Sequence, residues 1–164
     1  MKRVVLFVAA FVFFLCSANA QIGKSIYEKY STMEGVEAEY VAPFKLILGL
    51  LLAPDLLEGI FESDLSLEEW GEVLRSMRGI YALDVTDTFV IYFLDKDVSK
   101  AVKEGELELL MESRSEGNIS RVYASSEGDK ATGIVIYAIE PGESSFVSID
   151  FHLDLSRLKA LLAS

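Results

Sequence analysis

The sequence predicts an α+β fold in which a mainly antiparallel sheet carries helices on one face, as in a ferredoxin-like two-layer sandwich. Two observations lead to this prediction. Apolar residues recur at helical spacing through much of the chain, and after Gly105 their period changes to two. In addition, 51% of the 164 residues are apolar, which is too many for a disordered chain, and the length suits a single domain.

The chain opens with two basic residues, an uncharged apolar run over residues 4–15 and a small-residue triplet that ends at Ala20. A basic start, a short apolar stretch and a small-x-small site are typical of a secretory signal peptide. We therefore expect a signal peptide over residues 1–20, cleaved between Ala20 and Gln21, and one domain over residues 21–164. The expected localisation is periplasmic or secreted.

Cys16 offers an alternative route, because a bacterial lipoprotein signal ends in a cysteine that receives lipid. The bulky Leu15 before it disfavours this route, so a lipid anchor on Cys16 is the second interpretation. Since Cys16 is the one cysteine of the sequence, cleavage after Ala20 would leave a cysteine-free mature chain. Such a chain has no disulfide, no thiol nucleophile and no thiolate metal site.

The charge balance is acidic, with 15 Lys and Arg against 26 Asp and Glu, a net charge of −11 and a pI near 4.5. This excess argues against nucleic-acid binding, which needs clustered basic residues, and against docking on an anionic membrane surface. The longest apolar run of the mature part, residues 44–52, is too short to span a membrane. We expect no integral membrane span in the mature chain.

The first elements follow from apolar spacing and from helix-ending residues. Gly35 and Gly79 are expected to end helices, and Ser66 with Glu69 forms a capping box that starts one. The elements expected up to Val85 are a helix over 24–33, a strand over 36–42, a buried helix over 44–52, a helix from 66 to Gly79 with Trp70, Val73, Leu74 and Met77 on one side, and a strand over 80–85.

The apolar run over 44–52 is either core or an interface, because it would be unexpected on a free surface. The candidate interface residues are Phe44, Leu46, Ile47, Leu48, Leu50 and Leu51.

Residues 88–103 carry two opposed signals. Residues 88–93 are β-branched and aromatic, which favours a strand, whereas three lysines at 96, 100 and 103 share one side of a helix. We predict a helix capped by Thr86 or Asp87, with Val90, Leu94, Val98 and Ala101 on its inner face.

From Leu107 onward the alternation predicts a four-stranded antiparallel meander with turns near residues 116–118, 127–129 and 141–142. The segment 133–139 is apolar on both faces and is expected in the middle of the sheet. The residues expected to face inward are Leu107, Leu109, Met111, Val147, Ile149, Phe151 and Leu153, with Ser148, Asp150 and His152 outward. Asp154 is expected to cap a final helix that carries Leu155, Leu158, Leu161 and Leu162.

Few residues suggest chemistry. Asp95, Asp97, Ser99 and Glu106 stand at calcium-loop spacing, but Lys100 occupies the position that needs glycine, and a solvated helix face explains the segment better. The single histidine, His152, lies between Asp150 and Asp154 in the sequence, and we expect a surface position for it. We predict no catalytic residue, no cofactor and no metal site.

The order of several segments is similar to that of the small exported bacterial proteins of domain-of-unknown-function family 4252. The similarity rests on residues 27–30 before Gly35, on the stretch 76–80 that leads into a strand, on residues 107–112, and on residues 147–154 before the last helix. This resemblance implies a Gram-negative envelope location and an α+β fold, and it supplies no activity and no catalytic residues.

The sequence therefore predicts an exported cell-envelope protein that is a non-enzymatic binding or interaction module. Its partner would be another envelope protein or a small ligand. One alternative is a periplasmic binder of a small apolar or cationic ligand held between sheet and helices, which the acidic balance would favour for cations. A further alternative is a hydrolase that uses carboxylates around His152.

Overall fold

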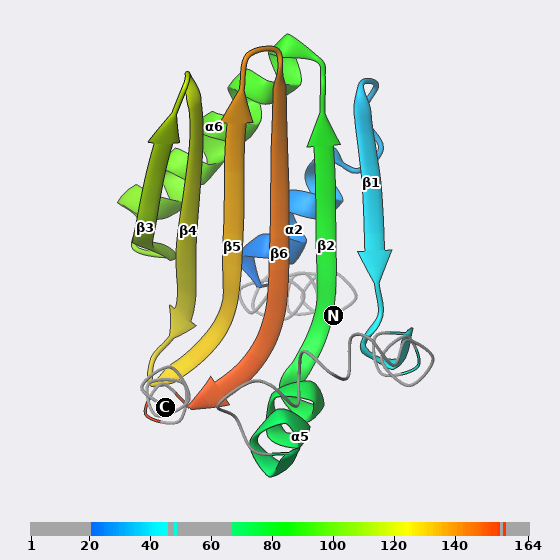
Figure 1. The fold of residues 1–164 in the computed structure, drawn as a ribbon, viewed down its shortest axis with the longest axis vertical. Helices are drawn as coiled ribbons and strands as arrows, with labels where there is room; N and C mark the ends of the chain where they lie inside the picture. The colour runs from blue at the N-terminus through cyan, green and yellow to red at the C-terminus, as the bar shows by residue number, and fades with distance from the viewer. Residues whose placement is uncertain (1–20, 46–47, 49–66, 155, 157–164) are drawn as a thin grey trace, which may run out of the picture.

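The structure is a computed structural model that describes residues 21–45, 48, 67–154 and 156. Its centre is an open six-stranded antiparallel sheet with strand order β1-β2-β6-β5-β4-β3 (Figure 1). The elements in chain order are α2 (Ile22–Tyr30), β1 (Val36–Val41), α5 (Leu67–Ser76), β2 (Met77–Val85), α6 (Thr88–Lys103), β3 (Leu107–Ser115), β4 (Asn118–Glu127), β5 (Lys130–Glu140) and β6 (Glu143–Asp154). The α+β class is thereby confirmed, whereas this strand order does not confirm a ferredoxin-like sandwich.

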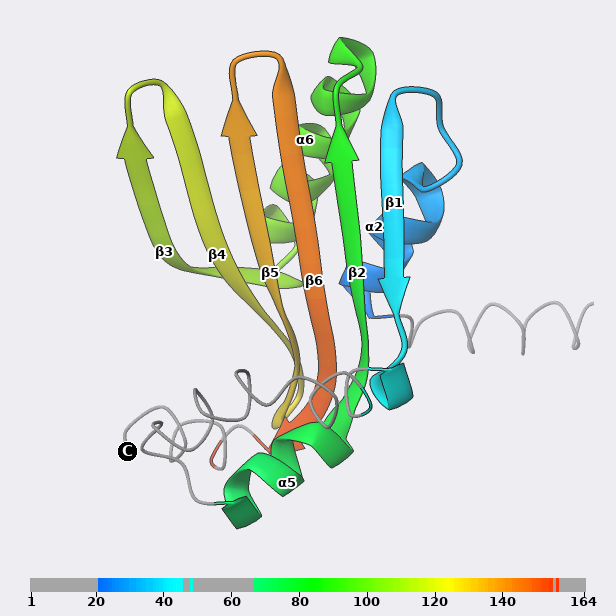
Figure 2. The same ribbon diagram turned by 45° about the vertical axis from the view of Figure 1, so that its right-hand side comes forward.

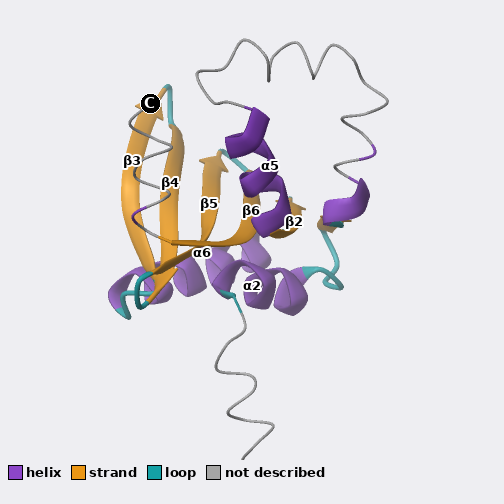
Figure 3. Cartoon of the chain, turned by 90° about the horizontal axis from the view of Figure 1, so that it is seen from below, coloured by secondary structure: helices purple, strands orange, loops and turns teal. Residues whose placement is uncertain are grey.

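Helices α2 and α6 lie together on one face of the sheet, and α5 lies on the other side (Figure 3). The main core fills the space between the sheet and helices α2 and α6. On the other side of the sheet, a smaller cluster of Ala131, Phe151 and Leu153 packs with Val73 of α5. The main core consists of Ile26, Tyr30, Leu83, Val85, Val90, Leu94, Val98, Ala101, Leu107, Tyr123, Val135, Tyr137 and Phe146. The expected signal peptide and most of the expected C-terminal helix lie outside the described residues.

Helix α6 resolves the opposed signals of its segment in favour of the helix. Asp87 caps it, because its carboxylate accepts hydrogen bonds of 3.0 Å from the backbone N–H groups of Phe89 and Val90. The four residues expected on the inner face are all buried. Burial of this stripe on the sheet outweighs the strand propensity of residues 88–93.

The predicted end of the helix before β2 is wrong. Helix α5 ends at Ser76, Met77 already belongs to β2, and Gly79 lies inside that strand. A Cβ at position 79 would lie 2.7 Å from Cε2 of Tyr40. Gly79 therefore makes room for the ring of Tyr40 on the neighbouring strand, and it does not end a helix.

The predicted inward faces of β3 and β6 also need correction. On β6 the face under α2 and α6 carries Ser144, Phe146, Ser148 and Asp150, all buried, while Val147 and Ile149 lie half-buried on the other face. Phe151 and Leu153 are buried as expected, but against α5. On β3 only Leu107 is buried, because β3 is an edge strand that α6 covers at its start; Leu109 and Met111 are exposed.

Candidate functional site

The face of the sheet that points away from α2 and α6 carries one continuous row of apolar side chains. Paired positions on five adjacent strands form it, in the order Ala82, Val147, Ile136, Val122 and Met111. Ile136 is 38% exposed and Met111 64% exposed, and the other three are half-buried. We call this row and the sheet surface around it the open face. In Figure 2 this face is turned toward the viewer, with α6 and α2 behind the sheet.

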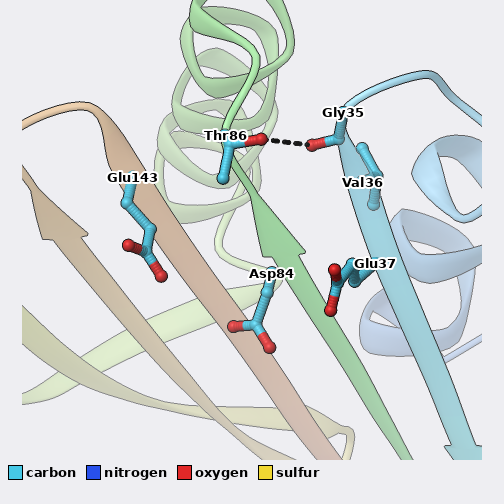
Figure 4. Close-up of a pocket in the computed structure, with 6 residues that line it drawn as sticks. All are labelled: Gly35, Val36, Glu37, Asp84, Thr86 and Glu143. Carbon is cyan, nitrogen blue, oxygen red and sulfur yellow. Dashed lines mark hydrogen bonds between the residues drawn. The ribbon is translucent and has the colours of Figure 1, made fainter.

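A pocket of about 460 Å³ lies at the upper end of the open face, where β1, β2 and β6 run side by side (Figure 4). Its acidic lining comes from Glu37, Asp84 and Glu143, one from each strand. Gly35 completes the wall next to β1, and its carbonyl accepts a 2.9 Å hydrogen bond from the backbone N–H of Thr86. This bond ties the loop before β1 to the end of β2 and so holds the pocket walls together.

At this end of the open face, carboxylates lie opposite each other on paired strands without basic side chains between them. Glu37 pairs directly with Asp84 across two strands, and Glu140 pairs with Glu143 across the next hairpin. We call these four residues the acidic rim. None of them forms an ion pair within the described part of the chain, whereas Glu112 on β3 receives hydrogen bonds of 2.7 Å from both Arg114 and Arg121.

Like charges placed directly opposite each other on paired strands destabilise a sheet. The acidic rim contains two such pairs, and selection for stability alone would remove them. Over the described residues no group of three His, Cys, Asp or Glu lies close enough to hold a metal ion. The rim is therefore suited to attract an extended cationic group, such as an amine or a basic side chain.

A second polar cluster lies buried beneath the first turn of α2. Asp150 is 1% exposed; its Oδ1 accepts a 2.5 Å hydrogen bond from Ser148 Oγ, and its Oδ2 has no partner. Burial raises the pKa of Asp150, although hydrogen bonds from Ser148 and from the backbone N–H of Lys24 act against this rise. A Cβ at Gly23 would lie 1.7 Å from Ser148 Oγ, so the helix approaches the sheet as closely as its backbone allows.

This buried cluster does not support hydrolysis. His152 is exposed, whereas Asp150 is buried beneath α2, so these two residues do not form an acid–base pair. Ser148 is also 1% exposed and contacts a carboxylate directly, without an imidazole between them. The expectation that Asp150 faces outward is corrected, because Asp150 shares the buried face under α2 with Phe146 and Ser148, whereas His152 is exposed as expected.

A shallow groove of about 160 Å³ lies between α2 and α6, near the place where a ligand between sheet and helices was considered. Its wall contains the Lys29–Asp97 ion pair, and Tyr30 Oη also donates a 2.6 Å hydrogen bond to Asp97. Burial by itself would raise the pKa of Asp97, but the hydrogen bonds from Lys29 and Tyr30 outweigh burial and lower this pKa. Asp95, Asp97 and Ser99 lie within α6, which confirms the helix predicted there, and Asp97 joins this helix to α2.

The predicted interface segment is only partly described. Phe44 is 72% exposed and Leu48 43% exposed, while the other candidates, Leu46, Ile47, Leu50 and Leu51, lie outside the described residues. No sequence pattern indicates the acidic rim, because its members are scattered over more than a hundred positions. Strand alternation alone would have placed Glu37 on one face, but pairing with Asp84 depends on register.

Within the described residues no helix is long and apolar enough to cross a membrane. Among curated proteins and among solved structures no relative matches the chain. The model of a domain of unknown function, DUF4252, matches residues 50–161, so the matched part begins after α2 and β1. Because this match spans more than half of the sequence, the chain belongs to the DUF4252 family.

Proposed function

We propose that this chain is an exported, non-enzymatic binding module whose open face receives a segment of a partner envelope protein. The observation that carries the proposal is the acidic rim at one end of an apolar row. The row offers a surface for apolar side chains, and the rim offers charge complementarity to Lys or Arg. The partner segment would thus be apolar in its middle and basic at one end.

The geometry of the sheet supports a polypeptide as the occupant. The row crosses five strands from Ala82 to Met111, and neighbouring strands lie about 4.8 Å apart, so the row is close to 20 Å long. This length matches about six residues of an extended segment. A small organic cation in the 460 Å³ pocket is the second candidate, since that volume lies within the range of small-molecule sites.

Export is part of the proposal, with cleavage between Ala20 and Gln21. The side-chain amide of Gln21 donates hydrogen bonds of 3.0 Å to the carbonyls of Thr132 and Phe151, so the domain uses this residue as its first anchor. The intact mass of the protein purified from its own cells tests this. A mass equal to residues 21–164 is expected; a mass that includes residues 1–20 would contradict cleavage, and added lipid mass on a chain starting at Cys16 would favour the lipoprotein alternative.

Binding on the open face is tested by photo-crosslinking in intact cells. A photoreactive amino acid replaces Ile136 in the middle of the row, and in a matched control it replaces Leu109, which is exposed on the edge strand. We expect position 136 to capture a partner segment that contains apolar residues followed by Lys or Arg. Equal capture from both positions, or captured segments that are acidic, would refute the proposal.

The contribution of the acidic rim is tested by neutralising it. The variant Glu37→Gln, Asp84→Asn, Glu143→Gln removes three pocket carboxylates, and the control Glu106→Gln, Glu127→Gln, Asp129→Asn removes three exposed carboxylates elsewhere. Exposed ion pairs contribute roughly 0.2–1 kcal/mol each, so capture at low salt should fall about tenfold in the first variant and hardly in the second. Loss of crosslinking when a millimolar organic amine is present during irradiation would instead favour the small-ligand candidate.

A further inference from the structure

Three aromatic side chains stand in solvent on the first two turns of α6. Phe89 is 76% exposed, Tyr92 62% and Phe93 50%, and the rings of Tyr92 and Phe93 meet edge to face with centroids 5.4 Å apart. The core side of the same helix is separate, because Val90 and Leu94 point into the sheet. Exposed aromatic surface of this kind amounts to roughly 300–400 Å², the size of patch that usually has a role on a soluble protein.

The remaining turns of the same helix face are basic. Lys96, Lys100 and Lys103 share the arc of the aromatic residues at 3.6 residues per turn, and no Asp or Glu of α6 lies in that arc. Lys100 forms an exposed ion pair of 3.7 Å with Glu104, whereas Lys96 and Lys103 have no ion-pair partner among the described residues. The outer face of α6 is therefore aromatic in one half and cationic in the other. We call it the α6 outer face.

The fold separates this surface from the acidic rim. The α6 outer face lies on the helix side of the sheet, and the acidic rim lies on the open face on the opposite side (Figures 2 and 3). A surface that touches α6 on its outer side would thus meet lysines first, with the sheet between it and the rim. At physiological ionic strength the Debye length is about 8 Å, so the layered thickness of about 10 Å screens most of the repulsion from the rim.

The entry point of the chain lies on the same side. Gln21 stands at the N-terminal end of α2, and α2 packs beside α6. The twenty residues before Gln21 contain the apolar run 4–15 and Cys16. During export, before the cleavage proposed above, and in the lipoprotein alternative, the segment before Gln21 would hold this end of the chain at the membrane. The membrane would then lie next to the α6 outer face.

We infer that the α6 outer face docks on a phospholipid bilayer that contains anionic lipids. The net charge of the whole chain argued against such a surface, but the charge that a bilayer meets here is that of the lysines on this face. Phe89, Tyr92 and Phe93 enter the interfacial region, and Lys96 and Lys103 lie against headgroup phosphates. Aromatic rings suit this region because they combine an apolar body with a polarisable edge, and Tyr92 keeps its hydroxyl in water. The open face then points away from the membrane, so this inference stands independently of the proposed binding function.

The test is sedimentation of the chain starting at Gln21 with vesicles of phosphatidylglycerol and phosphatidylethanolamine, or of phosphatidylcholine alone. The first variant replaces Phe89, Tyr92 and Phe93 by Ser, and the second is Lys96→Glu, Lys103→Glu. The matched control replaces Leu109 and Leu110 by Ser, because these edge-strand residues are exposed to a similar extent and lie outside the apolar row. Circular dichroism verifies that each variant is folded.

We expect the wild type and the control to bind the anionic vesicles, and the aromatic variant to lose at least tenfold in partitioning. The lysine variant should lose a similar factor on anionic vesicles at low salt and little on phosphatidylcholine, since each lysine near an anionic surface contributes about fivefold. Failure of the wild type to bind anionic vesicles would overturn the inference, as would equal loss in the control. A change in oligomeric mass of the aromatic variant without a change in vesicle binding would assign the surface to a protein contact instead.

Discussion

Replacing Gly23 by Ala probes how closely α2 packs on the sheet. An alanine normally stabilises a helix relative to glycine by up to about 1 kcal/mol. Here its Cβ would lie 1.7 Å from Ser148 Oγ and 2.4 Å from Ser148 Cβ, where carbon contacts normally begin near 3.5 Å. The hydroxyl can rotate away, but the Cβ cannot, so the first turn of α2 must move out by about 1 Å.

The cost follows from what this displacement disturbs. Forcing an additional methyl group into a close-packed contact costs about 1–3 kcal/mol. The displacement also stretches the two hydrogen bonds from the Gln21 side chain to Thr132 and Phe151, each of which contributes about 1 kcal/mol. After subtracting the gain in helix propensity, we expect Gly23→Ala to lower the free energy of unfolding by about 2–3 kcal/mol.

Urea unfolding followed by far-UV circular dichroism measures this difference. The matched control is Gly71→Ala, since a Cβ there would meet only the flexible end of Arg75 at 3.4 Å, and it should leave stability unchanged or slightly higher. Adding Ser148→Gly to Gly23→Ala should recover at least about 1 kcal/mol relative to the sum of the single changes, because both blocking atoms are gone. If Gly23→Ala is as stable as the wild type, α2 does not pack on β6 in this way.

Three further changes test other contacts. Because burial raises the pKa of Asp150, the folded state holds its proton more tightly than the unfolded state. The contribution of this group to stability is therefore greatest below the ordinary carboxyl pKa of about 3.9 and falls as pH rises toward the folded value. Asp150→Asn should flatten that part of the urea-midpoint profile, and an unchanged slope would count against a buried carboxylate. Tyr30→Phe removes the 2.6 Å hydrogen bond to Asp97 and should cost about 1.5 kcal/mol in urea unfolding, without effect when Asp97→Ala has already removed the acceptor. Asp87→Ala removes the cap of α6 and should cost about 1 kcal/mol and speed amide exchange in its first turn, whereas unchanged exchange there would argue against the cap.

Local patterns were sufficient for the helices and strands whose stabilising interactions are near in sequence. The inner stripe of α6 follows from helical spacing, and its cap at Asp87 is a contact within three residues. The end of α5 was not predictable in this way, because Gly79 has two uses that look alike in a sequence. Only the ring of Tyr40, which lies on another strand, shows that this glycine serves close packing.

The faces of β6 show the same limit more clearly. Alternation divides its residues into two sets, and hydropathy suggested that the set with Val147 and Ile149 faces the helices. The structure places Ser148 and Asp150 there, because α2 approaches so closely at Gly23 that only a short side chain fits beneath it. Steric space between two elements that are far apart in the sequence therefore outweighs hydrophobicity at these positions.

The class of the fold, the stripe that attaches α6 to the sheet and the excess of acidic residues all follow from the amino-acid pattern. The positions of the charges depend on how the elements pack: strand register collects Glu37, Asp84 and Glu143 on one side, and helix packing leaves Lys96 and Lys103 on the other. Net charge is a sum over the chain and carries no direction, whereas a partner senses only the charges within about a Debye length of the surface it touches. Local spacing fixes which side of an element a residue occupies, and long-range pairing fixes which residues become neighbours.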